Sequence, residues 1–90
     1  MPDNFTITIK GVHKDLTFPV NFEVDWVYFK RFKIVARNGT LTFELHSPKG
    51  ENSYWNIVGR QPKTEAGKLQ MQYMIEELER YLKNRRYGKP

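Results

Sequence analysis

The sequence predicts an α+β domain, with about five strands in a mostly antiparallel meander and one long C-terminal helix packed on one face of the sheet. Three observations lead to this prediction. Apolar and polar residues alternate through most of the first 60 positions, as in half-buried strands. The pair Asn38-Gly39 separates two of these stretches, as in a tight hairpin. Residues 64–86 repeat apolar side chains every three to four positions, as in an amphipathic helix.

The first two strands are predicted at residues 4–10 and 16–26. In the second, every other residue from Leu16 to Trp26 is apolar, so we expect one face of the whole strand to point into the core. Eleven residues is about twice the usual strand length, and we therefore expect a bend or bulge after Asn21. Pro19 cannot donate a ladder hydrogen bond, which places the strand at an edge, at least locally.

Residues 27–31 break the alternation and are expected to turn the chain. Strands at 31–37 and 40–46 then form the hairpin around Asn38-Gly39, a pair that suits a type I′ turn because both residues tolerate positive φ. A two-residue loop at this pair predicts that Ile34 faces Phe43 and that Lys33 faces Glu44.

A fifth strand is predicted at 54–59, with its odd-numbered apolar residues inward and Tyr54 on the other side. The helix follows at 64–86, with Thr64 as its N-cap. Its expected buried stripe consists of Gly67, Met71, Met74, Ile75, Leu78, Tyr81 and Leu82.

The composition of the chain limits which functions and cofactors are possible. Ninety residues make one domain, 1–90, and a chain without cysteine has no disulfide and no thiolate metal site. We expect no metal and no cofactor, because two histidines alone make no structural zinc site and no phosphate-binding glycine motif occurs. No apolar run is long enough to span a bilayer and no secretory signal is recognisable, so we expect a cytoplasmic protein without a membrane partner.

The net charge of +5 favours an acidic partner, and residues 24–40 hold four cations against one aspartate. In the predicted hairpin, Arg31, Lys33 and Arg37 share one face, with Tyr54 available for stacking. We therefore predict a small non-enzymatic module that binds a polyanion, such as single-stranded nucleic acid. The full predicted site is Arg31, Lys33, Arg37 and Tyr54 with Lys83, Arg85 and Arg86 at the end of the helix.

Three alternatives stay open. The cationic strand face is also what an ordinary solvated sheet looks like. A protein partner or a second copy of the chain could bind Leu69 and Tyr73, which lie one turn apart on the polar side of the helix. A small enzyme would need His46 as a base oriented by Glu44, two residues away on the same strand face.

Overall fold

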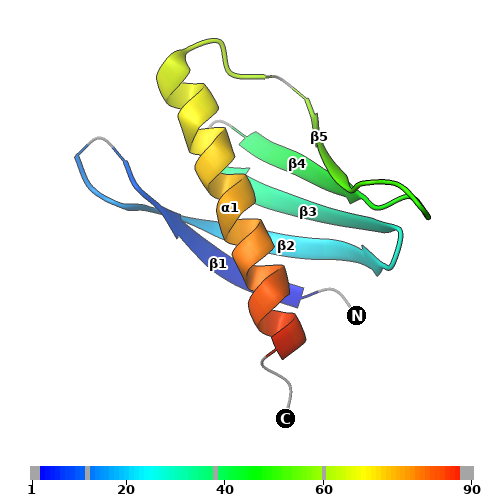
Figure 1. Ribbon diagram of the computed structural model, residues 1–90. Helices are drawn as coiled ribbons and strands as arrows, with labels where there is room; N and C mark the ends of the chain where they lie inside the picture. Colours follow the sequence, from blue (N-terminus) through cyan, green and yellow to red (C-terminus); the bar gives the residue numbers. More distant parts are fainter. Residues whose placement is uncertain (1–2, 12, 38, 60, 88–90) are drawn as a thin grey trace. The chain divides into compact units, whose positions relative to one another are not determined.

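The computed structural model describes residues 3–11, 13–37, 39–59 and 61–87, without the side chains of residues 3 and 85–87. It confirms the α+β class, the five-stranded antiparallel meander and the long C-terminal helix. The strands are hydrogen-bonded in chain order, β1-β2-β3-β4-β5 (Figure 1). The elements are β1 Asp3–Ile9, β2 Leu16–Trp26, β3 Phe29–Ala36, β4 Gly39–His46, β5 Tyr54–Val58 and α1 Glu65–Tyr87.

The chain divides into two compact units. The first comprises residues 1–6 and 18–61 and therefore holds β3, β4, β5 and most of β2. The second comprises residues 7–17 and 62–90, which hold the end of β1, the start of β2 and the helix α1. The buried apolar side chains of the first unit are Val20, Phe22, Phe32, Ile34 and Phe43. Those of the second are Ile7, Ile9, Met71, Met74 and Leu78.

A β-bulge divides β2 into two parts with opposite faces. Phe22 pairs with Phe32 of β3, but Val24 pairs with Arg31, so one extra residue, Glu23, lies between the two pairs. Because side chains alternate along a strand, one extra residue moves everything after it to the other face. The predicted irregularity after Asn21 is therefore confirmed. The prediction that Trp26 faces the core is wrong, since its side chain is 58% exposed.

The β3–β4 hairpin differs from the predicted register by two residues. Ala36 pairs with Gly39, Ile34 with Leu41 and Phe32 with Phe43, whereas a loop at Asn38-Gly39 would have put Ile34 opposite Phe43. A shift of two residues leaves every side chain on its predicted face, so the hydrophobic pattern cannot distinguish the two registers. Gly39, with φ of 132°, is the first residue of β4 and pairs with Ala36 of β3, so it does not form the predicted turn. Asn38 lies outside the described residues.

The helix of the second unit begins as the sequence predicts. The hydroxyl oxygen of Thr64 accepts a hydrogen bond from the backbone N–H of Gly67 at 3.0 Å, which is the N-cap interaction. Gly67 allows a close approach there, because an added Cβ would lie 2.7 Å from Cβ of Pro62. Of the predicted stripe, Met71, Met74 and Leu78 are buried. Within the described part of the chain, no helix is both long and apolar enough to cross a membrane.

The bulge makes opposite predictions for two aromatic residues of one strand. Replacing Phe22 by alanine removes a side chain that is 1% exposed and is expected to cost about 3–5 kcal/mol of unfolding free energy. Replacing Trp26, beyond the bulge, is expected to cost less than about 1 kcal/mol. Urea unfolding followed by circular dichroism measures both. Equal losses of stability in the two variants would contradict the bulge.

Candidate nucleic-acid interface

The candidate site is the sheet surface that we call the Arg31 face. It consists of the side chains of the first unit that alternate away from the buried Phe22, Phe32 and Phe43. Its residues follow from the pairing of β2, β3, β4 and β5, and they form rows that run across the strands. Every residue of these rows belongs to the first unit, so the face is defined by the sheet alone.

Four aromatic side chains form one row at the β2–β3 turn end of this face. Trp26 pairs with Phe29, Phe29 with His46, and His46 with Tyr54. The His46 and Tyr54 rings are stacked, with centroids 5.0 Å apart and an interplanar angle of 8°, and His46 meets Phe29 edge-on at 5.1 Å. Trp26 lies at one end of the row and is 58% exposed, and Tyr54 lies at the other end and is 54% exposed, so both leave ring surface open to solvent. Because His46 and Tyr54 stack face to face and Phe29 is inclined by 61° to His46, the rings do not form one flat surface. A planar ligand can stack on the exposed ring at either end of the row, Trp26 or Tyr54.

The next outward positions along β3 are occupied by Arg31 and Lys33. The Arg31 guanidinium lies 5.3 Å from the centroid of the Phe29 ring, so the cation directly adjoins the aromatic row. Arg31 Nε is 3.3 Å from a Glu44 carboxylate oxygen, and Lys33 Nζ is 3.4 Å from one of Glu23. The Arg31 and Lys33 side chains remain 37% and 42% exposed. The Lys33–Glu23 pair is exposed enough to be worth only about 0–1 kcal/mol, so Lys33 can exchange its partner for a phosphate. The Arg31–Glu44 pair is part-buried and uses Nε of Arg31, so Arg31 would meet a phosphate through its terminal nitrogens.

Glu44 organises the middle of the Arg31 face. Its carboxylate accepts a hydrogen bond from Arg31 Nε at 3.3 Å and one from the Asn56 amide at 3.5 Å. His46 Nε2 lies 3.4 Å from an oxygen of the same carboxylate. Its side chain is only 14% exposed, so Glu44 presents little negative surface while it contacts these three neighbours. Arg31 and His46 are thereby held in place before any ligand arrives.

The structure brings together some of the residues predicted for the site. Arg31, Lys33 and Tyr54 share the Arg31 face, and Arg37, just past the end of β3, is exposed. Lys83 is exposed on α1 in the other unit, and the side chains of Arg85 and Arg86 lie outside the described part of the chain. Of the two residues predicted for a protein interface, Leu69 is 46% exposed and Tyr73 is half-buried.

Sequence reasoning misses most of the aromatic row. Alternation from Phe22 assigns Trp26 to the core because it assumes an unbroken strand, and the bulge reverses that assignment. The predicted turn at 27–31 includes Phe29, although β3 begins there and pairs Phe29 with both Trp26 and His46. The signal that could have revealed the row is the unusual length of the alternating stretch, since a bulge within it reverses every residue that follows.

The predicted pairing of His46 with Glu44 is present, but both groups have other contacts. The His46 ring lies between Phe29 and Tyr54 as a member of the aromatic row. Glu44 is shared with Arg31 and Asn56. Among the described residues, no group of three or more histidine, aspartate or glutamate side chains is placed to hold a metal ion.

Comparison with known proteins adds no relative. The chain matches no protein-family model, and it has no significant match among curated proteins or solved structures. A function for the chain is therefore inferred from the geometry of the Arg31 face.

Proposed function

We propose that the protein is a small binding module for single-stranded nucleic acid and that the Arg31 face is its binding surface. The observation that carries the proposal is the aromatic row, exposed at Trp26 and Tyr54, with Arg31 directly beside it and Lys33 next along β3. Proteins that bind single strands combine aromatic side chains, on which bases stack, with cations that follow the phosphate backbone. A cytoplasmic location and a non-enzymatic role remain parts of this proposal.

The aromatic row supplies the larger share of the expected affinity. Stacking of a base on an aromatic side chain is worth about 1–3 kcal/mol per base, irrespective of the base. Trp26 and Tyr54 are exposed at the two ends of the row, so each can receive a base without any rearrangement of the sheet. A duplex keeps its base faces covered, and stacking on an exposed ring such as Trp26 or Tyr54 therefore favours single strands.

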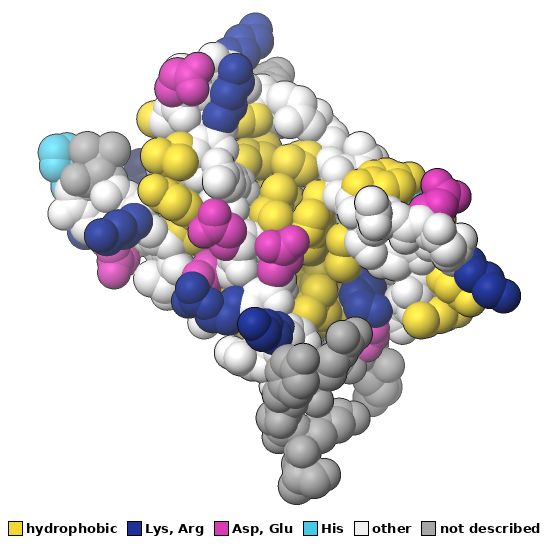
Figure 2. Space-filling model, viewed as in Figure 1, with side chains coloured by type: hydrophobic (Ala, Val, Ile, Leu, Met, Phe, Trp, Pro, Cys, Tyr) yellow, Lys and Arg dark blue, Asp and Glu magenta, His cyan; other side chains and the backbone are white. Residues whose placement is uncertain are grey.

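The cations supply a smaller, salt-dependent contribution. Close to the face, Glu23 and Glu44 neutralise part of the charge of Lys33 and Arg31. Binding therefore requires Lys33 to turn from Glu23 to a phosphate, while Arg31 keeps Glu44 at Nε and offers its terminal nitrogens. The net charge of +5 attracts a polyanion from a distance. On the side of the molecule drawn in Figure 2, acidic and basic side chains are interspersed over the described part of α1.

Neutralising the two cations tests the proposal. The double substitution Arg31→Gln/Lys33→Gln should weaken binding of a fluorescein-labelled oligothymidylate, measured by fluorescence anisotropy at low and moderate salt. For single strands, the slope of log K against log salt should become shallower by about 0.7 for each phosphate that the variant no longer neutralises.

The matched control is Lys49→Gln/Lys63→Gln, which removes the same charge from two exposed lysines outside the Arg31 face. It should reduce affinity far less than the face variant. Circular dichroism of both variants reports whether they fold. Absence of binding by the unmodified protein at low salt, or an equal reduction of affinity in both variants, would exclude the Arg31 face as a nucleic-acid site.

A protein-interaction or self-assembling role is the second candidate, and the exposed Leu69 on α1 favours it. If the chain self-associates through this helix surface, sedimentation velocity over a concentration series should show a dimer that Leu69→Glu shifts toward monomer. Glu76→Gln, an exposed change on the same helix, serves as the comparison. A monomer at every concentration would argue against self-association.

A further inference from the structure

A surface hollow lies on the Arg31 face at the end away from the aromatic row. It has a volume of about 360 Å³, at the lower end of the range of ligand pockets. Its lining includes Pro19 and Asn21 of β2 and Val35 of β3, with Asn4 and Thr6 of β1 on the other side. All these residues belong to the first unit, and the exposed ones include Pro19 and Val35.

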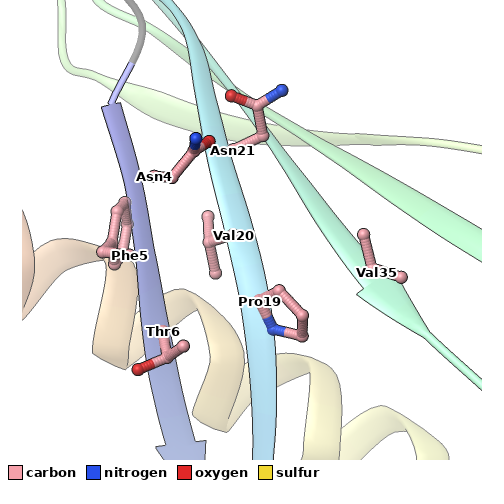
Figure 3. Close-up of a pocket in the computed structure, with 7 residues that line it drawn as sticks. All are labelled: Asn4, Phe5, Thr6, Pro19, Val20, Asn21 and Val35. Atoms are coloured by element: carbon pink, nitrogen blue, oxygen red, sulfur yellow. The ribbon is translucent and has the colours of Figure 1, made fainter.

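The hollow has an apolar end and an amide end. Figure 3 shows the side chains of Asn4 and Asn21 at one end and those of Pro19 and Thr6 at the other, with Val35 beside Pro19. Within the part of the chain that the structure describes, neither asparagine amide donates or accepts a side-chain hydrogen bond. The surface that lines the hollow is almost entirely apolar, so the two amides lie at its rim and offer donors and an acceptor there. A nucleobase needs this combination, because its faces are apolar and its edge carries adjacent donors and acceptors.

The hollow is in line with the proposed binding surface. The outward positions of β3 are, in order, Phe29, Arg31, Lys33 and Val35, so one strand leads from the aromatic row past both cations to the hollow. Asn21 pairs directly with Lys33, which places the amide end beside the second cation. Six residues of strand span about 20 Å. This length suits a short single-stranded segment of roughly four nucleotides, the smallest site size of single-strand binding domains.

We propose that the hollow is a second base-binding subsite, which receives a nucleobase of the same strand that stacks on the aromatic row. This inference rests on the proposed function and extends it. One base lies on the aromatic row, Arg31 and Lys33 contact the intervening phosphates, and a base further along the strand packs on Pro19 and Val35. The amide of Asn21 meets the edge of that second base.

Oligothymidylates of two to eight nucleotides, measured by fluorescence anisotropy, test the subsite. In the unmodified protein, affinity should rise by about fivefold or more once the oligonucleotide is long enough to reach from the aromatic row to the hollow. In Val35→Asn and in Asn21→Ala this gain should disappear, while the dinucleotide binds as before. An abasic residue at the terminal position should weaken binding to the unmodified protein and leave binding to Asn21→Ala unchanged.

Val58→Asn is the matched control. Val58 is an exposed valine of the same face, 45% exposed against 51% for Val35, and it does not line the hollow. This variant should keep the length-dependent gain. If long oligonucleotides bind but Val35→Asn and Asn21→Ala keep the full gain, the subsite is wrong and the proposed function stands. If the unmodified protein binds no oligonucleotide of any length at low salt, the proposed function fails and the subsite fails with it.

Discussion

The bulge at Glu23 is the constraint on which the first unit depends. Before it, β2 places Val20 and Phe22 among the buried residues; after it, the same strand places Val24 and Trp26 on the opposite face. Without the extra residue, the alternation would direct the Trp26 side chain to the face that holds the stacked rings of Phe22 and Phe32. The bulge thus moves a large aromatic ring to the surface.

The proposed function follows from that displacement. Trp26 pairs with Phe29 only because the register of β2 has shifted by one residue, and the pair completes a row that His46 and Tyr54 continue across the sheet. Bulges often redirect a side chain beside a functional site. The same extra residue, Glu23, lies close enough to Lys33 to form an ion pair. One irregularity in one strand therefore positions both the end of the aromatic row and the partner of a cation on the same face.

How much of the structure can be predicted from the sequence depends on which structural property each sequence pattern reflects. Alternation records the face of a side chain, and it correctly places Ile34 and Phe32 inward and Arg31, Lys33 and Tyr54 outward. Alternation does not distinguish two registers that differ by two residues. The predicted β3–β4 pairing is therefore wrong, although every side chain of the two strands is assigned to the correct face. The N-cap at Thr64 is predictable because a helix start depends on a few neighbouring residues.

The candidate site is harder to predict than the fold. The aromatic row joins residues from four strands, and the residue that completes it depends on a bulge whose position the pattern indicates only as somewhere after Asn21. The hollow joins three strands through side chains that look ordinary in the sequence, such as Pro19, Asn21 and Val35. Sites of this kind arise from the pairing of neighbouring strands. The pattern of residues along one strand does not specify which residues of the next strand lie beside it.

The fluorescence of Trp26 tests the central claim most directly. The chain has two tryptophans, and Trp55→Phe leaves Trp26 as the reporter on the Arg31 face. Trp55 pairs with Leu45 on the opposite face of the sheet, so Trp26→Phe provides the complementary control. Titration with oligothymidylate should quench Trp26 emission saturably, and added salt should reverse the quenching, while Trp55 emission stays constant. Binding that leaves Trp26 emission unchanged, or that quenches Trp55 instead, would contradict the assignment of the aromatic row as the binding surface.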